Sequence, residues 1–199
     1  PLFITEIARQ IKSLGGQTYL VGGCVRDRFL GLEPEDFDIE VYGISGKSLA
    51  EVLSGFDKVV YVGKSFAVFK IGSLNFSLPQ RSSAANSDGS SDQSIPSVSL
   101  REALRRRDLS INTIAQDVLT GKLYDPFGGL GDLQLKVLRA TDPGTFVEDR
   151  LRPYRIMQLA GRLGFSVDPA TAELCRSLDL TDLPRERVFE EFKKLLMKS

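Results

Sequence analysis

Asp36 and Asp38 stand one residue apart in the stretch EPEDFDIEV. The alternation of polar and apolar residues over 36–41 predicts a strand, so both carboxylates should point to the same face. Two carboxylates on one face repel each other unless a cation lies between them. Oxygen ligands that leave room for water and phosphate suit Mg²⁺, so the pair predicts a magnesium site. The alternative is the ordinary polar outer face of a sheet.

A pair of glycines precedes this acid pair. Gly22 and Gly23 lie between TYLVG, an expected strand over 18–22, and CVRDRFLG, an expected helix closed by Gly31. Two residues without Cβ atoms permit a tight turn and a close approach to a ligand, and the start of a helix stabilises an anion. Arg26, one turn into the helix, could contact the same anion. Together with the acid pair, this pattern favours nucleotidyl transfer, in which metal ions activate the attacking hydroxyl and neutralise the triphosphate. A plain strand-to-helix turn is the alternative.

Basic residues gather in one segment of a chain that has no net charge. The chain has 26 Lys and Arg against 26 Asp and Glu, but residues 101–107 read REALRRR. Such a cluster indicates a local phosphate ligand, although a solvated helix face has the same pattern. The sequence has no histidine, which excludes Ser-His-Asp triads and zinc sites that need imidazole. Two distant cysteines are typical of free thiols in a cytoplasmic protein.

The elements that must position these residues change in type along the chain. Apolar spacing predicts a first helix over 3–14 that ends at Gly15-Gly16, and a short helix over 48–53. Residues 82–99 are rich in Ser, Asn, Asp and Gly and predict a loop. From Pro143 onward the pattern is helical. We therefore expect an α+β head over 1–140 and an all-helical second domain over 141–199. Further strands are expected at 58–62, 66–71, 74–78 and 122–124, and a helix from Leu100.

Four segments resemble one family in order and spacing. GGCVRDRFLGLEPEDFDIEVYG is similar to the signature of the class II tRNA nucleotidyltransferases and bacterial poly(A) polymerases, within the polymerase β-like superfamily. RRRDLSINTIAQDVLTGKLYDPFGGLGDL resembles that family's RRD–IN–DPFGG segment. VLRATDPGTFVEDRLRPYRIMQLAGRLGF resembles its EDxxR segment, and LPRERVFEEFKKLL resembles its neck helix. The likeness covers nearly the whole chain except 82–99.

The resemblance implies a polymerase β-like nucleotidyltransferase head with a mixed or antiparallel sheet, followed by a helical neck. It also implies the roles of individual residues. The catalytic pair that holds the metal would be Asp36 and Asp38. The residues in contact with the nucleotide would be Gly22, Gly23, Arg26, Arg106, Arg107, Asp108 and Asn112. Asp149 and Arg152 would read the base, and Asp125 and Gly129 would form a hinge between head and neck. The base-reading role is chemically reasonable, because a carboxylate accepts from an exocyclic amine and a guanidinium donates to ring acceptors. An ordinary i, i+3 ion pair is the alternative for Asp149 and Arg152.

The chain also departs from the pattern that it resembles. Asn75 stands where the family often has a third acid, and the loop 82–99 nearly lacks positive charge. The sequence stops at the neck helix, so we expect either a fragment or a chain that depends on another. Pro153 follows the EDRLR motif: inside a helix it would cost about 3 kcal/mol or more, unless the helix begins there and leaves Asp149 and Arg152 in the entry turn.

The resemblance implies template-independent addition of CMP and AMP to the 3′ end of tRNA, with CTP and ATP as substrates, Mg²⁺ as cofactor, release of pyrophosphate and no membrane. A poly(A) polymerase, or an enzyme that adds only CC or only A, is the alternative within the same chemistry. A module that binds nucleotide or RNA without transfer is the alternative from another class, and Asn75 with the loop 82–99 favours it.

Overall fold

The computed structural model describes residues 2–62, 68–79 and 98–198 and divides into two compact units. The first unit comprises Pro1–Ala103 and Ala115–Tyr124, and the second comprises Leu104–Ile114 and Asp125–Ser199. The chain therefore passes from one unit to the other at three places. The predicted loop falls mostly on 80–97, outside the described residues. The division into domains at residue 140 stays a prediction.

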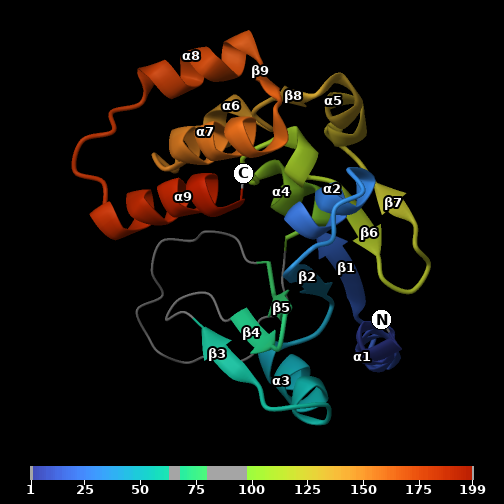
Figure 1. The fold of residues 1–199 in the computed structure, drawn as a ribbon. Coiled ribbons are helices and arrows are strands. Elements are labelled where there is room, and N and C mark those ends of the chain that lie inside the picture. The colour runs from blue at the N-terminus through green and yellow to red at the C-terminus, as the bar shows by residue number, and fades with distance from the viewer. Residues whose placement is uncertain (1, 63–67, 80–97, 199) are drawn as a thin grey trace. The chain divides into compact units, whose positions relative to one another are not determined.

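A mixed seven-stranded sheet forms the centre of the first unit, with strand order β3-β4-β5-β2-β1-β6-β7 (Figure 1). Neighbouring strands are antiparallel except β2 and β5, which run parallel. The strands are β1 (Gln17–Val21), β2 (Phe37–Tyr42), β3 (Val60–Val62), β4 (Val68–Ile71), β5 (Leu74–Ser77), β6 (Ala115–Asp117) and β7 (Leu123–Tyr124), and the helices are α1 (Leu2–Ser13), α2 (Gly23–Phe29), α3 (Gly46–Ser54) and the start of α4 (Leu100–Arg105).

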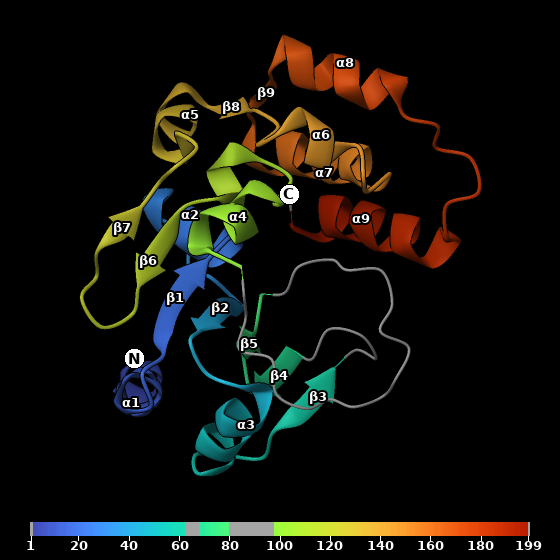
Figure 2. The ribbon, with the colours of Figure 1, turned by 180° about the vertical axis from the view of Figure 1, so that it is seen from behind.

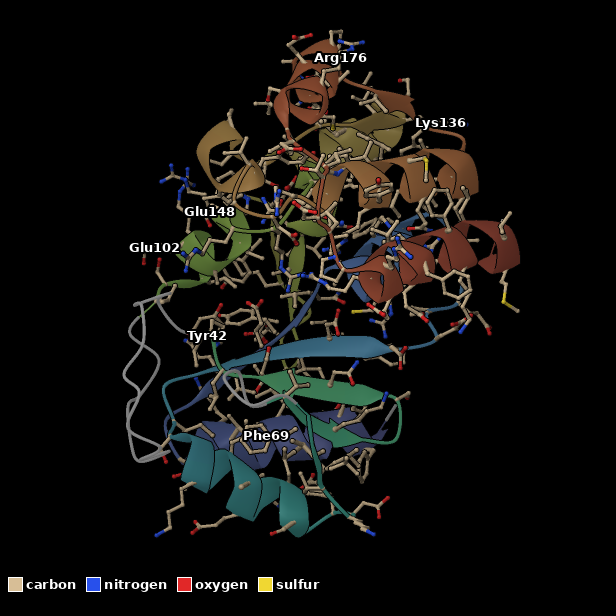
Figure 3. The ribbon with its side chains drawn as sticks, turned by 90° about the vertical axis from the view of Figure 1, so that its left-hand side faces the viewer. Tyr42, Phe69, Glu102, Lys136, Glu148 and Arg176 are labelled. Carbon is tan, nitrogen blue, oxygen red and sulfur yellow. The ribbon has the colours of Figure 1, made fainter. Side chains whose placement is uncertain are left out.

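The two faces of this sheet differ in character. Ile39, Phe76 and Phe69 are in register across three strands and are at most 3% exposed, so they form a core on one face. Gly46, at the start of α3, lies beside the ring of Phe69, and α1 packs against both α3 and β1. Figure 3 shows Tyr42 on the opposite side of the sheet from Phe69. The second face carries polar side chains, among them those of Asp38, Asn75 and Lys70.

The second unit is helical around a small core. Helix α7 lies between α8 and α9 in both views (Figures 1 and 2), and α7 packs closely on α9. Leu109, Ile111, Leu138 and Phe146 are completely buried. Its elements are the end of α4, the 3-10 helix η1 (Ser110–Asn112), α5 (Gly129–Leu135), β8 (Val137–Leu138), α6 (Pro143–Phe146), α7 (Arg152–Leu163), β9 (Ser166–Val167), α8 (Pro169–Ser177) and α9 (Arg185–Lys198).

Local sequence signals explain where the helices of this unit begin. Asp142 accepts a hydrogen bond from the N–H of Thr145 at 2.9 Å and caps α6, and a proline follows the cap. Helix α7 begins at Arg152 with Pro153 in its first turn, where proline needs no hydrogen-bond donor. The second alternative for Pro153 is therefore confirmed, and Asp149 lies in the turn that enters the helix.

The structure confirms the α+β class and most of the expected elements. The strands expected at 18–22, 36–41, 58–62 and 74–78 occur within two residues of those bounds. Strand β6 was not expected, because AQD has three residues and no alternation, and it forms by pairing with β1. The expectation that the chain is only helical after Pro143 was wrong at β9, which pairs with β8 over two residues.

Candidate functional site

The predicted acid pair lies at the start of β2. Asp38 is in register with Val21 of β1 on one side and with Asn75 of β5 on the other. Residues in register across a sheet share a face, so the side chains of Asp38 and Asn75 are neighbours. The Nδ2 atom of Asn75 donates to the Oδ1 atom of Asp38 at 3.3 Å. The position that lacks the third acid is therefore in direct contact with the acid pair.

Lys70 shows that Asp36 reaches the same face. Lys70 on β4 is in register with Asn75 and shares its face. Its Nζ atom lies 3.7 Å from the Oδ1 atom of Asp36, which stands directly before β2. Asp36 and Asp38 thus present their carboxylates to one side, as the alternation predicts. The side chain of Asp36 is 59% exposed and Asp38 is exposed too, so both remain accessible to a ligand.

The donor set of this face fits a hard divalent cation. Two exposed carboxylates and the amide oxygen of Asn75 are the kind of ligand that Mg²⁺ takes when it also keeps water and phosphate. Among the residues that the structure describes, no group of three or more acidic or cysteine side chains could hold a metal ion. Glu40, two residues further on the same face, is buried and accepts from the Oη atom of Tyr42 at 2.7 Å. The metal would therefore be held by the acid pair.

The glycine turn lies next to Asp38. Val21 is in register with Asp38, and Gly22 follows Val21 directly. Gly22 has φ 73° and ψ −138°, a conformation that is open only to glycine. The turn between β1 and α2 is thus fixed beside the acid pair by the pairing of β1 with β2.

Arg26 folds back against this turn. A Cβ atom at Gly23 would lie 3.4 Å from the Nη2 atom of Arg26, which is only 5% exposed. The Nη2 atom of Arg26 lies 2.7 Å from the Oδ1 atom of Asp27. The structure therefore brings Gly22, Gly23 and Arg26 together. Burial raises the pKa of the Cys24 thiol, which argues against a nucleophilic role for that residue.

Asp108, of the RRD motif, is a buried carboxylate in the second unit. It is 4% exposed, and its Oδ1 atom accepts from the Nδ2 atom of Asn112 and from the N–H of Leu109, both at 2.9 Å. The Nη2 atom of Arg155 lies 3.3 Å from its Oδ2 atom. Burial alone would raise the pKa of Asp108, but Arg155 and these hydrogen bonds outweigh it and lower the pKa. The carboxylate is thus ionised, with hydrogen bonds at Oδ1 and the ion pair with Arg155 at Oδ2.

Arg152 connects the EDRLR motif to the RRD motif. Its Nη1 atom donates to the carbonyl of Thr145 and its Nη2 atom to the carbonyl of Arg106, both at 2.7 Å. Arg152 is 8% exposed, and its guanidinium lies over the ring of Phe146. Burial lowers its pKa from the ordinary value. Since a guanidinium has five N–H donors, base reading by Arg152 would use the donors that these two carbonyls leave.

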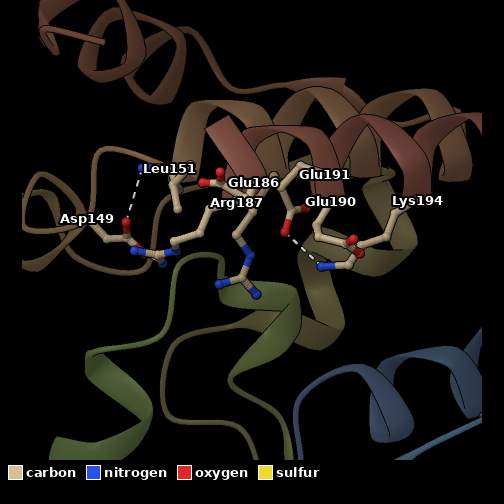
Figure 4. A pocket seen from close by; sticks show the side chains of 8 residues that line it. Asp149, Leu151, Glu186, Arg187, Glu190, Glu191 and Lys194 are labelled. Atoms are coloured by element: carbon tan, nitrogen blue, oxygen red, sulfur yellow. Dashed lines mark hydrogen bonds and ion pairs between the residues drawn. The ribbon is translucent and has the colours of Figure 1, made fainter. Parts of the chain in front are cut away.

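Asp149 lines a pocket of about 450 Å³ in the second unit (Figure 4). Its Oδ1 atom accepts from the N–H of Leu151 at 3.0 Å, and its Oδ2 atom lies 3.9 Å from the Nη2 atom of Arg187 on α9. Figure 4 shows Asp149 at one end of this pocket and Lys194 at the other. Apart from Leu151, its lining side chains are acidic or basic: Asp149, Arg155, Glu186, Arg187, Glu190, Glu191 and Lys194.

Asp125 and Gly129, the predicted hinge residues, are in direct contact in the second unit. The carboxylate of Asp125 accepts from the N–H groups of Gly129 at 2.7 Å and Leu130 at 2.9 Å, at the start of α5. A Cβ atom at Gly129 would lie 2.3 Å from the carbonyl oxygen of Ser110, so only glycine lets α5 approach η1 this closely. The boundary between the units falls directly before Asp125.

Sequence reasoning missed Lys70, Arg155 and Arg187. Lys70 has a period-two signal in VFKI, but its contact with Asp36 depends on the pairing of β4 with β5. Arg155 lies three residues after Arg152 on one helix, which could have placed both on the same face. No local signal links Arg187 to Asp149, because Arg187 lies 38 residues further along the chain, on α9.

Comparison with known proteins places these features in context. The family described as "Poly A polymerase head domain" matches residues 18–139, and the one described as "Probable RNA and SrmB-binding site of polymerase A" matches residues 164–199. A multifunctional CCA protein of Tolumonas auensis is 39% identical over 90% of this chain and 45% of its own. A multifunctional CCA protein of Nitrosospira multiformis is 38% identical over 91% of this chain and 44% of its own.

Solved structures give the same picture. A tRNA nucleotidyltransferase complexed with a primer tRNA and an incoming ATP analogue has a TM-score of 0.76 and 33% identity, covering 96% of this chain and 58% of the other. The CCA-adding enzyme of Thermotoga maritima complexed with tRNA has a TM-score of 0.81 and 26% identity, covering 100% of this chain and 47% of the other. The chain thus spans about half the length of the relatives that it matches. None of the helices in the described ranges is long and apolar enough to cross a membrane.

Proposed function

Because the chain belongs to the family of the poly(A) polymerase head domain, we propose that it is a template-independent RNA nucleotidyltransferase. It adds CMP and AMP from CTP and ATP to the 3′ end of tRNA and releases pyrophosphate. The observation that carries this proposal is the single face on which Asp36 and Asp38 stand beside the Gly22–Gly23 turn. The names of the relatives, which are CCA proteins and tRNA nucleotidyltransferases, support tRNA as the acceptor.

The residues of the first unit have complementary tasks in this reaction. Asp36 and Asp38 would hold Mg²⁺, which would lower the pKa of the attacking hydroxyl and neutralise charge on the triphosphate. The backbone at Gly22 and Gly23 approaches the phosphates closely, and Arg26 adds a positive charge behind the turn. Phosphoryl transfer depends mainly on positioning and charge stabilisation, so these fixed groups supply what the reaction requires.

The second unit selects the base. Asp149 lines the pocket and can accept from the exocyclic amine that cytosine and adenine share, which uracil lacks. Arg152 joins the segment of Asp149 to the segment of Arg106 through its two carbonyl contacts, and it donates to the base with its remaining N–H groups. Arg107, Asp108 and Asn112 belong to the same segment as Arg106, and this segment contacts the nucleotide. Asp125 and Gly129 act as the hinge between the two units.

Incubation with tRNA that lacks its 3′ CCA, Mg²⁺ and labelled CTP or ATP tests this proposal. Extension with C followed by A is expected for the wild type, and extension with C alone, A alone or a run of A would identify the other enzymes of this chemistry. Asp36→Ala and Asp38→Ala should abolish extension. Asp57→Ala, which removes an exposed acid elsewhere in the first unit, should leave extension unchanged.

One observation favours a second candidate, a module that binds nucleotide without transfer. Asn75 places a neutral amide against Asp38 and so brings no third negative charge to the metal site. This candidate is correct if the wild type and the Asp36→Ala and Asp38→Ala variants all bind nucleotide equally and none extends RNA.

A further inference from the structure

The acid pair has two neighbours that oppose metal binding, one a neutral amide and the other a cation. The Nδ2 atom of Asn75 donates to Asp38 at 3.3 Å, and the Nζ atom of Lys70 lies 3.7 Å from Asp36. Asn75 is in register with both Asp38 and Lys70, so the three side chains form one row across β2, β5 and β4. The row therefore places a neutral group and a cation at the side of the pair where further negative charge would strengthen a metal site.

We propose that Asn75 and Lys70 make metal binding by Asp36 and Asp38 depend on the triphosphate. The inference rests on the proposed function, since it assumes that the acid pair holds a metal and that a nucleoside triphosphate binds beside it. Without the triphosphate, the ammonium of Lys70 competes with a divalent cation for Asp36, and Asn75 occupies an acceptor site of Asp38. With the triphosphate, phosphate oxygens supply the missing negative charge and ligands.

The geometry allows this exchange. The side chain of Lys70 is 42% exposed and ends a flexible stem, so it can leave Asp36 when a metal ion binds. The freed ammonium can then turn to a phosphate oxygen. The neighbours of the pair thus favour the state in which metal and triphosphate are both present. Linkage requires the effect to be reciprocal, so the metal must also tighten triphosphate binding by the same factor.

Binding of Mn²⁺ to the complete 199-residue chain measures this dependence directly. The electron paramagnetic resonance signal of free aqueous Mn²⁺ gives the dissociation constant, with and without a CTP analogue that has an α,β-methylene bond. Mn²⁺ bound by the analogue alone is measured separately and subtracted. The ion at the acid pair is defined as the Mn²⁺ that Asp36→Asn releases.

For the wild type, the analogue should tighten Mn²⁺ binding about tenfold or more, within the usual range of coupling between sites. Asn75→Asp should tighten binding about tenfold without the analogue and much less with it, so the coupling falls. Lys70→Met should tighten nucleotide-free binding about two- to fivefold, as expected for the loss of one exposed ion pair. Lys47→Met makes the same charge change at an exposed site on α3 and should alter neither constant.

The outcomes separate this inference from the proposed function. Equal Mn²⁺ affinity with and without the analogue, or unchanged nucleotide-free affinity in both Asn75→Asp and Lys70→Met, overturns the role of these two residues while the metal site stands. Mn²⁺ binding that Asp36→Asn does not alter in either condition overturns the metal site as well. The Lys70→Met variant keeps the test decisive if Asn75→Asp fails to fold.

Discussion

The Nη2 atom of Arg155 lies 3.3 Å from the Oδ2 atom of Asp108, so a side chain of α7 pairs with the buried acid of the RRD motif. Arg152, three residues earlier, donates to the carbonyl of Arg106 in the same motif. Two motifs that lie more than 40 residues apart are thus held together by two arginines on one helix. These two of the segments that are proposed to contact the nucleotide are thus joined within the second unit.

Replacement of Asp108 by Asn should weaken this unit at neutral pH. The pKa of Asp108 is lowered in the folded chain, so its stabilising effect is present above the unfolded value of about 3.9 and is lost as the pH falls through the folded pKa. Asp108→Asn should cost about 1–3 kcal/mol at pH 7, and the difference from wild type should shrink below about pH 4. Urea unfolding between pH 7 and pH 3 measures both.

Asp182→Asn is the matched control for this change. Asp182 is exposed and has φ 55°, a conformation that Asn adopts readily, so its stability curve should follow that of the wild type. If Asp108→Asn loses stability with acid in parallel with the wild type over the whole range, the paired carboxylate does not act as described.

Gly129 should not tolerate alanine. A Cβ atom there would lie 2.3 Å from the carbonyl oxygen of Ser110, so α5 would have to move away from η1 at a cost of about 1–3 kcal/mol or more. Gly131 in the same helix has no atom within 4 Å of its Cβ position, and Gly131→Ala should be neutral or stabilising by up to about 1 kcal/mol. Chemical denaturation of the two variants gives the comparison, and equal stabilities would contradict the tight contact.

Gly22→Ala should impair both stability and nucleotide binding. Its φ of 73° and ψ of −138° are strained for any side chain, with an expected cost of about 1–3 kcal/mol. Because the turn is proposed to contact the phosphates, the affinity for CTP should fall as well. Gly31→Ala also introduces a side chain at positive φ, but in open space after α2, so it should lower stability without changing CTP affinity. Calorimetric titration with CTP distinguishes the two variants.

Arg152→Ala should affect folding and base choice together. Two partly buried carbonyls would lose the donors of a buried guanidinium, which should cost about 2–4 kcal/mol in unfolding experiments. In the fraction that stays folded, discrimination among CTP, ATP and UTP should weaken more than Mg²⁺ affinity does. Arg150→Ala is the control, because Arg150 also donates to two backbone carbonyls but is exposed, so water can replace it at a smaller cost. Unchanged base discrimination in Arg152→Ala would contradict a base-reading role.

Local patterns predicted those parts of the molecule that local physics decides. The alternation around Asp38 and the glycines at 22 and 23 each gave the correct element, because backbone preference and side-chain period determine them. Pro153 left two alternatives open, of which the structure shows the helix start. Strand β6 required the partner β1, and the contact of Lys70 with Asp36 required the register of three strands. Such contacts depend on pairing between distant segments, which a single sequence does not reveal.

The chain crosses between its two units three times, and this limits where the protein can be truncated. A truncation after residue 140 would keep Leu104–Ile114 but remove α7, the helix that supplies Arg152 and Arg155 to this segment. Asp108 would then lose its cationic partner Arg155, and the carbonyl of Arg106 would lose the donor that Arg152 supplies. A recombinant head of residues 1–140 expressed alone should therefore aggregate or be degraded by proteases. Separating the two parts of the chain at residue 140 should lower the stability of both.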